Sequence, residues 1–189
     1  LDGEGGMVWI KNRTSANWNV VEDTNRGATK TIYTNSTNAE ATQAQHITSF
    51  NSDGFTAGTD NDTNASGEDY ASWTFRKAEK FFDVVNFSGS VAPTTISHNL
   101  GVVPGMIIVK RTSAASDWWV WHTSIPNNAL ALNTTQDTST YNAPQYVYGD
   151  GVSVIQPTDA DFTIYTGNSG TYVAYLFASD AGGFGDDGS

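Results

Sequence analysis

The residues best suited to chemistry in this chain are the oxygen donors of Asp60-Asn61-Asp62-Thr63-Asn64. Alternating carboxylate and amide oxygens are typical of the first half of a calcium-binding loop. The second half of such a loop is missing, because Ala65 stands where the loop requires Gly and Ala71 where it requires a bidentate Glu. The pattern therefore favours a solvated turn, and calcium binding stays open only through ligands from elsewhere in the chain.

The histidines do not form a recognisable site. His46, His98 and His122 lie in separate segments without the HxH or HExxH spacing of a zinc site, so we predict no metal and no cofactor. We expect His122 to be a partly buried strand residue beside Trp121. No serine stands in a GxSxG nucleophile elbow. The acidic residues fall mostly in polar loops, where carboxylates stay solvated, so the pair that a glycosidase needs is not expected, and we predict no catalytic residue.

Aromatic side chains offer a second kind of site. In Trp118-Trp119-Val120-Trp121-His122 the side chains of a strand would alternate between two faces. Matching this run to Trp18-Asn19-Val20-Val21 assigns Trp118 and Val120 to the core and leaves the other face free to be exposed. Flat aromatic faces suit sugar rings and subunit interfaces alike, with core packing as the third alternative. The predicted contact residues are Trp119, Trp121, Tyr141, Tyr146 and Tyr148.

The strands that would carry these residues occur twice. Residues 6–16 are echoed by 105–114, and residues 66–75 by 169–177, in the same order. Short apolar runs rich in β-branched residues and bounded by Gly or Pro predict strands, and their repetition predicts a tandem duplication. We predict an all-β fold of two tandem, jelly-roll-like β-sandwich units: residues 1–79, residues 80–184, and a flexible tail at 185–189.

Two local features depart from this plan. Thr37-Asn38-Ala39-Glu40 has the form of a capping box and predicts a short helix that extends to about Gln45. The second unit opens with a strand expected over residues 81–87, whereas the first unit has no counterpart to it. The missing strand leaves an open sheet edge, which the tail, the other unit or a neighbouring subunit must cover.

The charge of the chain limits its partners. Nine basic and twenty acidic side chains give a net charge of -11, which repels phosphates and anionic membrane surfaces. We therefore expect neither nucleic acid nor membrane as a partner. No apolar run approaches the roughly 20 residues of a membrane-spanning helix, and the absence of cysteine excludes disulfides and thiolate metal sites.

Most of the chain resembles known viral segments. Residues 82–85, 96–111, 119–122 and 170–178 resemble a domain common in large virion proteins of marine tailed bacteriophages. The usual partner of that domain is similar to the first half, at residues 8–13, 26–30, 47–56 and 64–67. The resemblance implies a place in tail fibres, tail spikes and other exposed parts of a virion that is assembled in the bacterial cytoplasm. It implies no catalytic or ligand residue.

These observations predict a non-enzymatic structural protein of a tailed-phage virion. Repetition of a unit serves reach and valency, so we expect a homo-oligomer, with a trimer favoured, that contacts other virion proteins. One alternative is a receptor-binding module that holds host-surface glycan through Trp119 and Trp121. A second is a capsid decoration protein, and a remote third is a depolymerase.

Overall fold

The computed structural model describes residues 1, 3–126, 128–135, 153–155, 157–179 of the chain. All regular structure in these residues is β-strand, as the all-β prediction required. The described part contains no helix that is long and apolar enough to cross a membrane.

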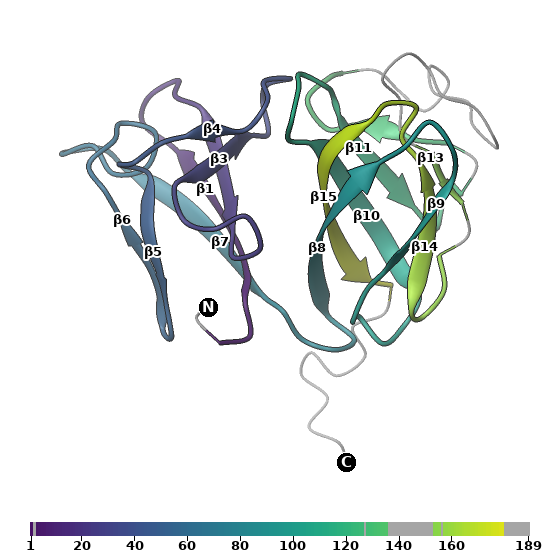
Figure 1. Ribbon diagram of the computed structural model, residues 1–189. Helices are drawn as coiled ribbons and strands as arrows, with labels where there is room; N and C mark the ends of the chain where they lie inside the picture. Colours follow the sequence, from purple (N-terminus) through teal and green to yellow (C-terminus); the bar gives the residue numbers. More distant parts are fainter. Residues whose placement is uncertain (2, 127, 136–152, 156, 180–189) are drawn as a thin grey trace.

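The first half of the chain forms a five-stranded sheet and a hairpin (Figure 1). The sheet has the order β4-β3-β2-β1-β7, and the hairpin joins β5 to β6. Apolar side chains that alternate along β1 and β2 pack beneath the hairpin and form a first core cluster with Leu1, Tyr33 and Ile47. The strands are β1 (Gly6–Asn12), β2 (Asn19–Asp23), β3 (Lys30–Tyr33), β4 (Ala41–Thr42), β5 (Ile47–Asn51), β6 (Gly54–Ala57) and β7 (Tyr70–Arg76).

The second half forms a five-stranded and a three-stranded sheet that enclose a second core cluster. The larger sheet has the order β12-β11-β10-β15-β8, and the smaller has the order β13-β14-β9. Phe87, Leu100 and Phe162 are among the side chains buried between them. The strands are β8 (Phe82–Gly89), β9 (Thr94–Ser97), β10 (Pro104–Arg111), β11 (Trp118–His122), β12 (Leu130–Ala131), β13 (Ser153–Ile155), β14 (Asp161–Tyr165) and β15 (Gly170–Ala178).

The two five-stranded sheets also pack against each other. A third core cluster takes Met7, Val21 and Ile32 from the first sheet and Trp118, Tyr175 and other side chains from the second. Figure 1 shows the resulting layers in the order hairpin, first sheet, second sheet and three-stranded sheet. Each five-stranded sheet is therefore covered on both faces, which explains why strands such as β10 and β11 are apolar at nearly every position.

Corresponding strands of the two halves pair in the same register. Met7 in β1 lies opposite Asp23 and Phe75, and Met106 in β10 lies opposite His122 and Phe177. The matching order and register support the predicted duplication, which remains a prediction. Every sheet of the described chain draws its strands from one side of residue 79, whereas the predicted tail at 185–189 lies outside the described residues. The boundaries of the two units stay a prediction.

The register corrects the alignment of the tryptophan segments. Lys11 pairs with Asn19, and its counterpart Lys110 pairs with Trp118, so the position equivalent to Trp118 is Asn19 and not Trp18. A shift of one residue exchanges the two faces of a strand. Trp18 is accordingly 44% exposed whereas Trp118 is 1% exposed.

The helix predicted over 37–45 is wrong. The segment is irregular up to the two-residue strand β4. A capping box needs the side chain at its fourth position to turn back to the first residue. Glu40 instead lies 3.3 Å from Arg26, and its N–H donates to Thr112 O at 2.9 Å. These tertiary contacts hold the segment out of a helix.

Candidate functional site

The predicted aromatic contact residues do not form one exposed face. Trp119 is only 6% exposed and belongs to the core of the second half, which agrees with core packing, the third alternative for this face. The reason is that the three-stranded sheet covers the face of β11 that carries it. Trp121 is partly buried beside the same core and donates from Nε1 to Pro126 O at 3.3 Å. Tyr141, Tyr146 and Tyr148 lie outside the described residues.

Two of the histidines have local structural partners. His98 is buried, accepts a hydrogen bond at Nδ1 from the Leu100 N–H at 3.2 Å, and stacks on Phe162. His122 is partly buried at the end of β11, as predicted, and its Nδ1 accepts from the Ser124 N–H at 3.1 Å.

His46 is the histidine that the fold brings to the acidic loop. The side chain is 1% exposed, and Nε2 lies 3.3 Å from Asp60 Oδ1 and 3.5 Å from Asp62 Oδ2. The three ligand atoms all lie within 4.8 Å of one another. The sequence left a metal site at Asp60-Asn61-Asp62 possible only with a ligand from elsewhere in the chain. His46 occupies the position of such a ligand. We call His46, Asp60 and Asp62 the His46 cluster.

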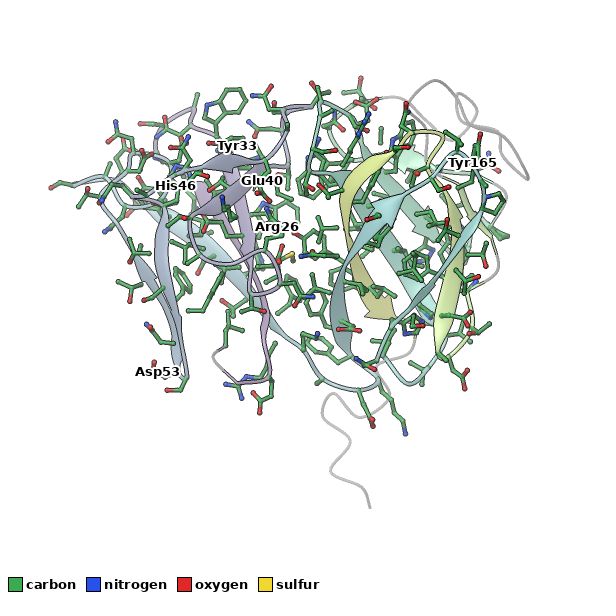
Figure 2. All side chains as sticks on the ribbon, viewed as in Figure 1. Arg26, Tyr33, Glu40, His46, Asp53 and Tyr165 are labelled. Carbon is green, nitrogen blue, oxygen red and sulfur yellow. The ribbon has the colours of Figure 1, made fainter. Side chains whose placement is uncertain are left out.

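Backbone contacts hold the acidic loop over His46. Gly58 N–H donates to His46 O at 2.6 Å, and Asp60 N–H donates to Gln45 O at 3.1 Å. A Cβ on Gly58 would lie 2.3 Å from Gln45 O, so this approach requires glycine. Asp60 Oδ1 accepts from the N–H of Asp62 at 2.9 Å, which closes a tight turn and directs both carboxylates toward the imidazole. Figure 2 labels His46 beside the first sheet.

A hydrogen-bond chain lies behind the imidazole. His46 Nδ1 is 3.0 Å from Thr31 Oγ1, and the Thr31 hydroxyl donates to Glu22 Oε1. The other Glu22 oxygen accepts from the Thr29 N–H at 2.8 Å. Burial raises the pKa of Glu22 to about 7, although these hydrogen bonds favour its charged form.

Burial also sets the charge of the cluster. It lowers the pKa of His46, against the opposing attraction of Asp60 and Asp62, and therefore favours the neutral imidazole. Burial raises the pKa of Asp62, and the hydrogen bond from the Trp18 N–H opposes that shift. The Asp60 side chain is 38% exposed and that of Asp62 is 14% exposed, so the cluster opens to solvent on the Asp60 side.

A few carboxylates are exceptions to the prediction that acidic residues lie mostly in solvated loops. Asp23 is fully buried, binds Arg26 Nε at 2.6 Å, and accepts from the Tyr175 hydroxyl at 2.7 Å. Asp83 is 2% exposed and lies 2.9 Å from Lys77 Nζ. The fold tolerates the burial of these two carboxylates because their ion pairs and hydrogen bonds compensate for the lost contact with water. Tyr175 belongs to the second sheet, so the Asp23 contact also ties the two halves together.

The outer edge of β7 is the most exposed strand edge of the first sheet. No described strand pairs with it, and Ser72, Trp73 and Thr74 are exposed. Arg13 lies opposite Asp69, and its N–H donates to Asp69 O. Because hydrogen-bonded pairs alternate along an antiparallel ladder, the odd-numbered residues of β7 make the hydrogen bonds to β1. The N–H and C=O groups of Ser72 and Thr74 consequently point outward. Trp73 contacts Trp9, with 5.8 Å between the ring centroids.

Comparison with known proteins gives a family without a function. The profile of a family described as a domain of unknown function (DUF7483) matches residues 3–189. No curated protein and no solved structure matches the chain.

Proposed function

The chain belongs to the DUF7483 family, whose description assigns no activity, and we propose from its contacts that it is a non-enzymatic structural protein of a tailed-phage virion. In this proposal it assembles as a homo-oligomer, a trimer in a tail fibre or spike, by covering the outer edge of β7 with a neighbouring copy. The outer edge of β7, which no described strand covers, is the observation that carries the assembly, and the viral setting rests on the sequence resemblance.

The second sheet provides the comparison that makes this edge informative. β15 corresponds to β7 in strand order, and its outer side is covered along its length by β8, from Gly170 opposite Gly89 to Phe177 opposite Phe82. β7 has no such neighbour among the described strands. A strand from a second copy would give the first sheet the covering that β8 gives the second.

The composition of β7 also favours pairing. Natural sheets protect free edges with lysine, proline, bulges or very short strands. β7 spans seven residues, Tyr70–Arg76, without lysine or proline, and it pairs with β1 without a register shift. Outward backbone groups on such an edge bind an added strand through main-chain hydrogen bonds, and the exposed Trp73 side chain adds apolar area.

A contact between the β7 edge and a different surface of the next copy is heterologous, and such contacts close into rings when the rotation allows. Three copies would form the smallest ring suited to a fibre. The net charge of -11 would keep the assembled surface soluble and limit further association.

The test is the mass of the full chain in solution, measured by light scattering at several concentrations, for the wild type and two variants. We expect a stable trimer for the wild type. Thr74→Pro removes an outward N–H without touching the hydrogen bonds to β1 and should dissociate the trimer. Thr74→Val keeps that N–H and is the matched control, which should remain trimeric.

A wild-type monomer at all concentrations would contradict the proposed assembly and favour a decoration protein that assembles only on a capsid. A trimer that persists in Thr74→Pro would place the contact elsewhere than the β7 edge. The glycan-binding alternative is weakened by the burial of Trp119, which cannot stack on a sugar ring while it lies in the core.

A further inference from the structure

We propose that His46, Asp60 and Asp62 bind a divalent transition-metal ion, Zn²⁺ first among them, which fixes the acidic loop to the first sheet. This inference is independent of the proposed assembly through β7. It rests on the spacing of the ligand atoms, on the orientation of a buried imidazole, and on the hydrogen bonds behind that imidazole.

Two of the three distances between the ligand atoms match a tetrahedral zinc site, and the third, between the two carboxylate oxygens, lies within 4.8 Å. Zinc binds imidazole nitrogen and carboxylate oxygen at about 2.0–2.2 Å, so two ligands of a tetrahedral ion lie roughly 3.3–3.6 Å apart. His46 Nε2 lies 3.3 Å from Asp60 Oδ1 and 3.5 Å from Asp62 Oδ2. An ion could therefore bind between His46 Nε2 and the two carboxylates.

One tautomer of the imidazole presents an electron pair to the two carboxylates. With the Thr31 hydroxyl donating to Glu22, the tautomer that completes this chain donates from His46 Nδ1–H to Thr31 Oγ1. A neutral ring that carries its proton on Nδ1 has a lone pair on Nε2. That lone pair faces two carboxylate oxygens inside a site where His46 is 1% exposed. A cation between the three atoms removes the repulsion that this arrangement otherwise contains.

The groups behind His46 match the outer shell of metal sites. A metal-bound histidine donates its other ring N–H to an oxygen, which fixes the tautomer and the orientation of the ring. Here that oxygen is Thr31 Oγ1, and Glu22 holds the Thr31 hydroxyl in turn. Glu22 and Thr31 are both fully buried on the first sheet, so the orientation of His46 is set by rigid strands.

The charges around the cluster favour a divalent cation. Asp60, Asp62 and Glu22 contribute three carboxyl groups around one imidazole. A bound dication would offset the negative charge of Asp60 and Asp62.

The ligand chemistry distinguishes zinc from calcium. Calcium prefers six or more oxygen ligands, about 2.3–2.6 Å away, whereas imidazole suits zinc and neighbouring transition metals. Three protein ligands leave a fourth position for water, on the side where Asp60 is exposed. The ion would join the loop at residues 58–64 to His46 at the start of β5, and so stabilise the hairpin against the first sheet.

Zinc titration of the chelator-treated full chain by isothermal calorimetry tests the site, with CaCl₂ titrated in parallel. We expect uptake of one Zn²⁺ per chain and a higher thermal unfolding midpoint with zinc. Asp60→Asn keeps the oxygen that accepts from the Asp62 N–H, so the loop should fold, and zinc affinity should fall at least tenfold. Asp62→Asn should act similarly. Asp53→Asn makes the same charge change at the hairpin tip, remote from His46 in Figure 2, and should leave zinc affinity unchanged.

Three results would overturn the proposal. Absence of stoichiometric zinc uptake would mean that a proton, not a metal ion, lies between His46 and the carboxylates. Equal zinc affinity in wild type, Asp60→Asn and Asp62→Asn would place any bound zinc elsewhere. Uptake of calcium in preference to zinc would refute the assigned ion. Circular dichroism of each variant verifies that a loss of affinity does not reflect unfolding.

Discussion

At the scale of single residues, Lys110 shows how strongly this fold perturbs a charged group. Lys110 is fully buried in β10, and Nζ donates to Thr37 O at 3.0 Å and to Ser116 O at 2.7 Å. Burial lowers the pKa of Lys110 to about 8, with Asp117 opposing that shift and Arg111 adding to it. The hydrogen bond to Thr37 joins the first half of the chain to the second.

This pKa predicts stability that rises with pH in the alkaline range. The folded pKa, about 8, lies below the value of 10.5 in the unfolded chain, so between these limits the unfolded state binds more protons. The free energy of unfolding should increase by about 1.5 kcal/mol between about pH 8 and about pH 9.5, on a slope of at most about 1.4 kcal/mol per pH unit. Urea denaturation at a series of pH values measures this increase in the free energy of unfolding.

Lys110→Met is the control for the pH effect. Methionine fills much of the same space without an ionisable group, so the increase between pH 8 and pH 9.5 should disappear. The variant should also be less stable at pH 9.5 than the wild type, since the hydrogen bonds from Nζ to Thr37 O and Ser116 O are lost and Thr37 O keeps only its bond from the Ser116 N–H. A wild-type free energy of unfolding that is flat or declining over this range would show that Lys110 is not buried as described.

At the scale of elements, β10 depends on a close approach that only glycine allows. The register between β10 and β15 shifts between Pro104 and Met106. At the shift, a Cβ on Gly105 would lie 2.4 Å from Ser179 Cα, and backbone cannot move aside as a flexible side chain could. Gly105 is thus required by space and not by an unusual backbone angle.

Gly105→Ala should destabilise the chain by about 1–3 kcal/mol, the usual cost of forcing extra atoms into a packed site. Gly54→Ala is the matched control, because Gly54 also lies in a strand but has nothing within 4 Å of the added Cβ. Its effect should stay within about 0.5 kcal/mol. Chemical denaturation of both variants measures the difference, and equal effects would contradict the close approach at Ser179.

At the scale of the whole molecule, the contact between the two five-stranded sheets unites the halves. Trp118 is buried in this contact, and its Nε1 donates across it to Tyr33 O at 2.8 Å. The Tyr175 hydroxyl crosses the same boundary to Asp23. Because the shared core cluster contains side chains from both halves, neither half can unfold without exposing apolar surface of the other.

We therefore expect a single cooperative thermal transition in calorimetry for the wild type. Trp118→Phe should lower the free energy of unfolding by about 1–3 kcal/mol, because it removes one of the two hydrogen bonds to Tyr33 O and creates a cavity. Trp18→Phe, at a 44% exposed position, should cost less than about 1 kcal/mol. Two separate transitions in the wild type would mean that residues 1–79 and 80–184 unfold independently.

Local sequence patterns were sufficient to predict most of the strands. Apolar runs bounded by Gly or Pro predicted β1 and β10, and the alternating run Trp118–His122 predicted β11, because strand formation depends on side-chain alternation and turn residues. The same patterns did not predict β3 and the short strands β4 and β12, which are stabilised by neighbouring strands. They also failed at Glu40, where a distant arginine overrides a local capping signal.

What the sequence by itself determined is the all-β class and the repeated order of strands, since both follow from local periodicity. The pairing of Lys110 with Trp118 and the burial of Trp119 were visible only in the tertiary structure. The same holds for the contact of His46 with Asp60 and Asp62. These features depend on contacts between residues distant in the chain. No spacing rule within the sequence encodes them, because they arise only when sheets stack and loops close.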